Sequence, residues 1–92
     1  MIKYTLYTEN KNIKSIKGIL NLFYQGYTII NTLGYWQGKK EKSLKIEVIT
    51  EKTEKDLIYN KIALNCIIET IKKINNQQTI LLTTESIKAD FL

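Results

Sequence analysis

The 92-residue sequence predicts a small α+β protein with the element order strand, helix, strand, strand, helix, strand. Four short segments are rich in β-branched and aromatic residues and in part alternate apolar with polar side chains, as half-buried strands do. Two segments instead repeat apolar residues every three to four positions, the period of an amphipathic helix. The sequence contains no proline. The length is that of one domain, and we expect residues 1–92 to form it.

The first strand is expected over residues 2–8, which are rich in β-forming residues. A polar break follows, in which Asn10 or Asn12 is suited to cap the next helix. That helix is expected over residues 13–24, with lysines on its outer face. Gly26 is expected to end it by taking the left-handed conformation after the last turn.

A hairpin is expected from a strand at residues 27–33 and a strand at residues 44–50. The segment 34–38 joins them, and a charged tip over residues 39–42 follows that segment. The strand 44–50 alternates apolar and charged residues, so one of its faces is expected to be apolar and the other charged.

The second helix is expected over residues 54–74, with a capping box formed by Thr53 and Asp56 at its start. The fourth strand is expected over residues 78–84. This element order predicts a ferredoxin-like fold, in which two helices cover one face of a four-stranded antiparallel sheet.

The second face of that sheet has no helix to cover it. We therefore expect self-association as a dimer or trimer that buries this face, because large apolar patches are unusual on monomers. The candidate side chains on this surface are Tyr4 or Tyr7, Ile49, and Leu81 or Leu82, with Phe91 and Leu92 contributed by residues 85–92.

Several kinds of chemistry are disfavoured by the composition. The chain has no histidine and one cysteine, Cys66, so the usual zinc sites and histidine-based acid–base catalysis are not available. Cys66 is expected to be structural, and its isolation indicates a reducing compartment. No apolar run has the length of a membrane span. We therefore expect a non-enzymatic protein without cofactor or metal, in the cytoplasm of a bacterium or an infected host cell.

The net charge of +5 comes from lysine alone, since the sequence has no arginine. Lysine attracts phosphate as a point charge but lacks the planar group that binds phosphate through two hydrogen bonds. Abundant lysine, isoleucine and asparagine are also typical of AT-rich genomes. Nucleic acid is therefore not an expected partner.

The candidate binding site is the segment between the two hairpin strands. It holds two of the four glycines and the only tryptophan, followed by lysines. An aromatic platform made by Trp36 and Tyr35, with Tyr24 and Tyr27 nearby, would stack on a base, a sugar or a partner surface. The predicted site residues are Gly34, Tyr35, Trp36, Gly38, Lys39 and Lys40. In the alternative interpretation, Trp36 packs over the sheet edge and the glycines only permit a bulged turn.

The element order and this glycine–aromatic hairpin, followed by Glu41, Ser43 and the strand beginning at Leu44, resemble those of PII-like and ACT-like regulatory proteins. A glycine–tryptophan–glycine hairpin is also similar to one in small uncharacterised bacterial proteins. The resemblance to PII-like proteins implies a trimer that binds nucleotides between its subunits. This chain differs in lacking their long flexible loop and their phosphate-binding arginines.

Two classes of function remain open. The first is an oligomeric binding protein for a nucleotide or another small anionic ligand at residues 34–42. The second is a protein-interaction inhibitor of a bacterial defence system, encoded by a phage or plasmid and acting on a host protein. A protein that sequesters a signalling nucleotide would satisfy both descriptions.

Overall fold

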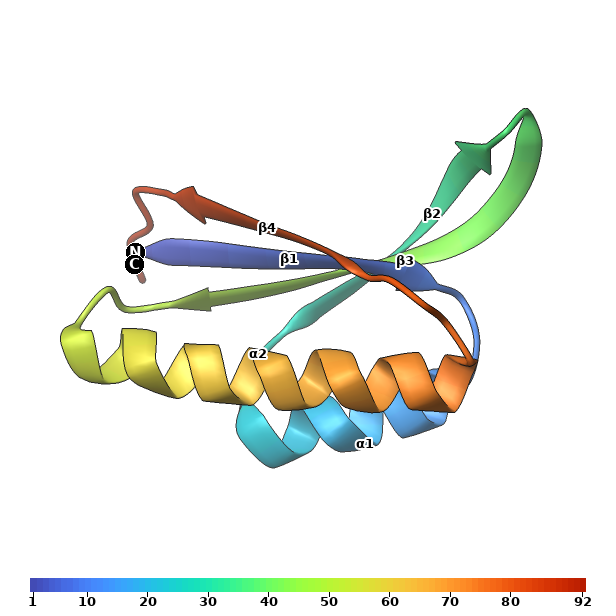
Figure 1. Cartoon of the computed structure of the whole chain (residues 1–92). Helices are drawn as coiled ribbons and strands as arrows, with labels where there is room; N and C mark the ends of the chain where they lie inside the picture. The colour runs from blue at the N-terminus through green and yellow to red at the C-terminus, as the bar shows by residue number, and fades with distance from the viewer.

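A computed structural model describes residues 1–92 and has the predicted element order. The elements are β1 (Ile2–Glu9), α1 (Ile13–Phe23), β2 (Thr28–Trp36), β3 (Lys39–Thr50), α2 (Glu54–Asn75) and β4 (Leu81–Ser86). The four strands form one antiparallel sheet in the order β2-β3-β1-β4, and both helices lie on the same side of it (Figure 1). The predicted ferredoxin-like fold is confirmed.

The core lies between the sheet and the helices. Alternation along β3 turns Leu44, Ile46 and Val48 toward the helices, and all three are buried. The helical period turns Ile67 and Ile71 of α2 down onto them. The other buried apolar residues are Ile2, Tyr4, Leu6, Ile16, Leu20, Tyr24, Ala63 and Leu64.

Asn12 stands at the start of α1, but its side chain does not cap the helix. Its backbone is left-handed, with φ of 55°. The side-chain amide instead donates to the carbonyl oxygen of Ile74 at 3.2 Å and to Oδ1 of Asn75 at 3.1 Å. The predicted cap is therefore wrong, and Asn12 joins the start of α1 to the end of α2.

The end of α1 also differs from the prediction. The helix ends at Phe23, and Tyr24 is already extended, while its N–H donates to the carbonyl of Leu20. Gly26 does not adopt a left-handed conformation. The extended backbone at Tyr24 coincides with burial of its side chain against α2, so tertiary packing ends this helix and no glycine cap is needed.

Thr53 caps the start of α2 as predicted, but the box is not reciprocal, because the Asp56 carboxylate accepts from the Thr53 hydroxyl at 2.6 Å. Thr53 Oγ1 accepts a hydrogen bond from the Asp56 N–H at 3.1 Å. At the other end, Asn76 takes the left-handed conformation, and its N–H reaches the carbonyls of Lys72 and Lys73. Local bonds thus satisfy some of the terminal N–H and carbonyl groups of this 22-residue helix, and Asn12 supplies a donor to the Ile74 carbonyl.

The β2–β3 hairpin is longer than predicted. Its turn consists of only Gln37 and Gly38, with φ of 51° and 77°, the pattern of a type I′ turn. The predicted charged tip, residues 39–42, is instead the first part of β3. Two positive φ angles match the right-handed twist of the strands, so pairing continues to the turn. The end of the hairpin bends away from the helices (Figure 1).

The face of the sheet that carries no helix, called here the open face, has charged residues at its centre. Lys3 Nζ lies 3.5 Å from a carboxylate oxygen of Glu47 and 3.6 Å from one of Glu85, and Lys45 lies 3.7 Å from Glu47. Glu85 is the main cause of the raised pKa of Lys3; desolvation opposes that shift and Glu47 adds to it. The expectation that this face is apolar is therefore wrong at its centre. The strand at residues 44–50 was predicted to have one charged face, and that charged face lies on the open face of the sheet.

The register of the sheet decides which of the proposed surface residues lie on the open face. Tyr7, Ile49 and Leu81 share the face of Lys3 and Glu47 and are exposed. Tyr4 and Leu82 share the opposite face with the core residue Leu6, so they point toward the helices.

The last strand begins later than predicted, at Leu81, and ends at Ser86. Beyond it, the Ile87 N–H donates to the Met1 carbonyl at 2.9 Å, and the Met1 amino group donates to the Ile87 carbonyl at 3.1 Å. Both ends of the described chain therefore lie at the same end of the sheet (Figure 1).

Candidate functional site

The predicted site residues lie at the end of the β2–β3 hairpin, where the pleat divides them between two faces. Trp36 is paired with Lys39, and both are on the side of the open face. Tyr35 is paired with Lys40 and points to the other side. Trp36 and Tyr35 are 70% and 68% exposed, so neither packs over the sheet edge.

The expected platform of four aromatic residues is wrong. Tyr35 and Trp36 face opposite sides because they are consecutive in a strand. Tyr24 is buried and meets Tyr59 edge-on, with 6.1 Å between ring centroids. The hydroxyl of Tyr27 donates to Asn21 Oδ1 at 2.7 Å, at the opposite end of β2 from Trp36. Of these four residues, only Trp36 is exposed on the open-face side at the end of the hairpin.

A hollow of about 490 Å³ adjoins Trp36. Trp36 forms one wall, and the ends of β1 and β3 and the connection from α2 to β4 form the rest. The other lining residues are Tyr7, Thr8, Glu9, Glu41, Ser43, Asn76, Gln77, Gln78 and Thr79. Its size lies within the range of about 300–1,000 Å³ that is typical of small-molecule pockets.

Gln77 holds one side of this hollow in place. Its Oε1 accepts from Thr8 Oγ1 at 2.8 Å and from the Glu9 N–H at 3.4 Å. Its Nε2 donates to the carbonyl of Thr79 at 2.8 Å. Asn75, itself buried, donates to Thr8 Oγ1 at 3.4 Å. These bonds tie the connection after α2 to the end of β1, so this wall is fixed in the folded chain.

The charges of the hollow differ from those expected for an anion site. Its two charged lining residues are carboxylates, Glu9 and Glu41, while no lysine lines it. Glu9 is paired with Lys11, with 3.0 Å between Nζ and Oε2. The nearest lysine of the predicted site on this face is Lys39, opposite Trp36. The hollow thus suits an uncharged group with hydrogen-bond donors, and an anion would be favoured toward Lys39.

The two predicted glycines have different roles. Gly38 has a positive φ and is part of the turn. Gly34 has no unusual φ and lies opposite Glu41, on the same face as Trp36. A Cβ placed there would make only ordinary contact, 3.7 Å from Ser43 Oγ. The backbone conformation at this position therefore does not require glycine. The absence of a side chain at Gly34 keeps the surface beside Trp36 unobstructed.

The second half of the hollow, formed by the connection from α2 to β4, was not predicted from the sequence. The amide residues 75–78 read as a simple connection, and Glu9 as part of a polar break. The run of four amide residues at 75–78 was the one sequence feature that marked this segment. Whether the segment lies near Trp36 depends on which strands lie beside β1 in the sheet.

Cys66 lies outside this site. The side chain is exposed on α2, next to the buried Ile67, so the expectation of a packed structural cysteine is wrong. Its position on the helix, one residue from the buried stripe, turns it to the surface. No group of three or more histidine, cysteine, aspartate or glutamate side chains is arranged to hold a metal ion.

No family model and no curated protein matches the chain. Among solved structures, a DUF3240 family protein from Shewanella baltica OS155 is 16% identical, with a TM-score of 0.72 over 99% of this chain and 93% of that one. CPII, a nitrogen regulatory PII-like protein from Thiomonas intermedia K12 bound to ADP, AMP and bicarbonate, is 12% identical, with a TM-score of 0.63 over the same shares.

A phage SAM lyase in complex with S-methyl-5′-thioadenosine is 8% identical, with a TM-score of 0.67 over 91% of this chain and 79% of that one. These identities are low enough that the likeness is one of fold. It confirms the resemblance to PII-like proteins at that level. None of the helices combines the length and apolar character needed to cross a membrane.

Proposed function

We propose that this chain is a small, non-enzymatic, oligomeric binding protein that holds a nucleotide or a related small anionic ligand at the end of the β2–β3 hairpin. The observation that carries this proposal is the exposed indole of Trp36 at the wall of a polar hollow. An exposed tryptophan beside a hollow offers a stacking surface for a flat ring.

The two parts of a nucleotide fit different parts of this site. The base would stack on Trp36 and donate hydrogen bonds to acceptors in the hollow, where Glu9, Glu41 and the side-chain amides lie. The phosphate would be repelled by the two carboxylates and attracted by Lys39 on the outer side of Trp36.

The ligands of the solved structures support an adenine nucleotide as the first choice. CPII is bound to ADP and AMP, and the phage SAM lyase to S-methyl-5′-thioadenosine. All three molecules carry adenine on a ribose ring, and the base has an exocyclic amino group that donates hydrogen bonds. They differ in charge, which makes them useful probes of the two halves of the proposed site.

The test is calorimetric titration of the full chain with ADP, AMP and S-methyl-5′-thioadenosine. Replacing Trp36 by alanine should weaken binding of all three by about 1–3 kcal/mol, the worth of base–aromatic stacking. Lys39→Ala should weaken ADP and AMP only, and less at high salt, because exposed charges are screened. The melting temperature without ligand should hardly change in either variant.

Tyr35→Ala is the matched control. Tyr35 is as exposed as Trp36 and sits on the same hairpin, but it faces the other side. It should leave nucleotide binding unchanged. No saturable heat with any of the three ligands, or an equal loss in the Tyr35 and Trp36 variants, would contradict the proposed site.

The second candidate is a protein-interaction inhibitor of a bacterial defence system. It is favoured by aromatic residues exposed on both sides of a projecting hairpin, since tyrosine and tryptophan are enriched among residues that dominate interfaces. A protein partner that encloses the hairpin would need both Tyr35 and Trp36. Loss of host-protein capture in both variants, without nucleotide binding by the wild type, would support this candidate.

A further inference from the structure

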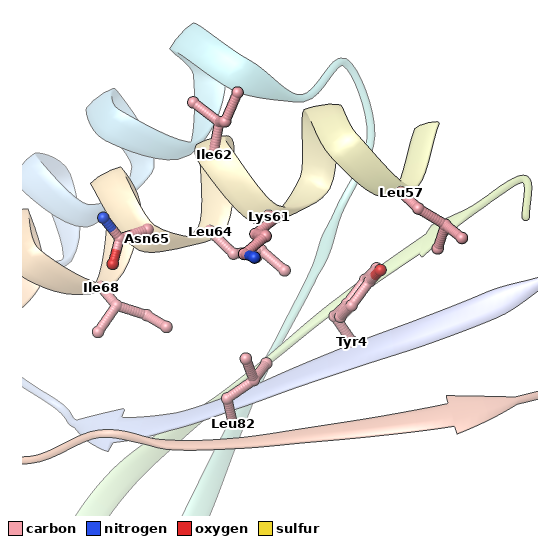
Figure 2. A pocket seen from close by; sticks show the side chains of 8 residues that line it. All are labelled: Tyr4, Leu57, Lys61, Ile62, Leu64, Asn65, Ile68 and Leu82. Carbon is pink, nitrogen blue, oxygen red and sulfur yellow. The ribbon is translucent and has the colours of Figure 1, made fainter. Parts of the chain in front are cut away.

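A second surface hollow, here called the α2–β4 groove, has a volume of about 690 Å³. It lies on the helix side of the sheet, away from the open face. Figure 2 shows Leu57 and Ile68 of α2 and Tyr4 and Leu82 of the sheet bordering the same space. Six of its eight lining residues are hydrophobic. The groove shares no residue with the hollow beside Trp36.

The groove exists because the helices do not cover the whole sheet. The buried residues of α2, such as Ile67 and Ile71, pack over the inner strands, whereas β4 is an edge strand that is exposed along its whole length. Leu82 faces the helix side but remains 37% exposed. Leu57 and Ile62 on α2 are exposed as well. The fold thus leaves apolar surface between a helix and a strand for another chain to bury.

The charge of the groove limits what can occupy it. Lys61 is its only charged lining residue, and its ammonium group forms no ion pair. The matching segment would carry neighbouring apolar side chains and one carboxylate.

Residues 89–92 of this chain have that composition, and Lys88 precedes them. Phe91 is 90% exposed and Leu92 is exposed beside it. Asp90, which precedes them, is exposed and forms no ion pair. The chain therefore carries both an uncovered apolar groove with an unpaired lysine and an uncovered apolar segment with an unpaired aspartate.

The segment does not reach the groove of its own molecule in this structure. The hydrogen bonds between Ile87 and Met1 direct it across the end of the sheet. Ala89, Asp90 and Phe91 there border a small hollow together with Thr28 and Ile49. Ile49 belongs to the open face, whereas the groove lies on the other side of the sheet at β4.

We propose that residues 89–92 of a second copy of this chain occupy the α2–β4 groove, with Phe91 and Leu92 on its apolar lining and Asp90 beside Lys61. This contact goes beyond the proposed ligand site and uses a surface other than the open face. It joins two different surfaces, so it gives a dimer if two copies exchange segments reciprocally, and otherwise a ring or a chain of copies.

A peptide experiment tests the contact directly. The probe is an amidated peptide with the sequence of residues 87–92, added to the full chain carrying Phe91→Ala and Leu92→Ala. The methyl NMR signals of Leu57, Ile62 and Leu82 should shift in a saturable way. A peptide with serine at the positions of Phe91 and Leu92 is the control and should cause no shift. Absence of shifts with the first peptide, or shifts confined to open-face residues such as Ile49, would overturn the proposal.

Charge exchange in the intact chain gives an independent test, with association measured by analytical ultracentrifugation over a range of concentrations. Phe91→Ala should weaken association about tenfold or more, as expected for an aromatic anchor. Lys61→Glu and Asp90→Lys should each weaken it about two- to fivefold, and the double variant should restore it. Unchanged association in Phe91→Ala, or no restoration in the double variant, would overturn the proposal. Neither result depends on nucleotide binding at Trp36.

Discussion

Tyr24 and Asn60 show how one buried polar contact sets local structure at the residue scale. The Tyr24 hydroxyl donates to Asn60 Oδ1 at 2.9 Å, and Asn60 Nδ2 donates to Thr50 Oγ1 at 2.7 Å. Burial raises the pKa of Tyr24 above its usual range, and the nearby Tyr59 and Tyr4 add to this shift. The neutral phenol is therefore part of the folded state, and it links the end of α1 to α2 and β3.

Replacing Tyr24 by phenylalanine should lower the free energy of unfolding by about 1–3 kcal/mol, because Asn60 Oδ1 loses its partner inside the protein. Chemical denaturation measures this loss. Tyr27→Phe is the matched control: its hydroxyl also forms a hydrogen bond, but an exposed one, so the change should be small.

The same tyrosine predicts a pH dependence. Its folded pKa is raised above the unfolded value of about 10, so its contribution to stability is complete below about pH 10 and is lost as pH rises through the folded pKa. Denaturation of wild type between about pH 10 and 12 should show a steeper loss of stability than Tyr24→Phe. Equal slopes in the two proteins would contradict the assignment.

At the scale of elements, the β2–β3 hairpin depends on its two-residue turn. Gln37 and Gly38 both have positive φ, which suits glycine and asparagine and costs other residues about 1–2 kcal/mol. The turn sets the register that places Lys39 opposite Trp36. The relative positions of Trp36 and Lys39 in the proposed ligand site therefore depend on the conformation of this turn.

Gly38→Ala should increase amide hydrogen exchange at Trp36 and Lys39, the pair that flanks the turn, because alanine is strained at a φ of 77°. Gln37→Asn should slow the same exchange, because asparagine tolerates the left-handed region better. The global melting temperature should change little in both variants, since the end of the hairpin projects beyond the core. A large fall in global stability in Gly38→Ala would show that the hairpin end is coupled to the core.

At the scale of the whole molecule, the open face is the surface through which we expect copies to associate. The ion pairs of Lys3 with Glu47 and Glu85 occupy its centre, and the exposed side chains of Tyr7, Ile49 and Leu81 lie on the same face. Mixed surfaces of this kind are typical of protein interfaces, in which charged residues set the register and apolar ones supply the energy.

Ile49→Lys combined with Leu81→Lys should shift the protein toward monomer in light scattering at micromolar concentration. Burial of one such side chain contributes about 1.5–3 kcal/mol, and the added charges repel each other across the interface. Leu22→Lys is the control, because Leu22 is an exposed apolar residue of α1, on the other side of the sheet. A wild-type protein that is monomeric at this concentration would contradict the expected association.

Much of this architecture was readable from the sequence because it follows from local periodicity. The alternation at residues 44–48 and the helical repeat from Leu64 to Ile71 define which side chains are buried, and Thr53 with Asp56 marks a helix start through contacts three residues apart. Six elements in this order then permit few topologies. The glycine–aromatic segment was also visible, since composition alone marks it.

The tertiary structure decided what depends on contacts between distant residues. Tyr24 ends α1 because Asn60, 36 residues later, binds its hydroxyl. Asn12 stands at the N-cap position, but its side chain binds Asn75 and leaves the helix uncapped. The hollow beside Trp36 exists only because the connection after α2 returns next to the end of β1, where Gln77 meets Thr8. Local sequence patterns do not predict such contacts between distant residues, because the order and twist of the strands in the complete sheet determine them.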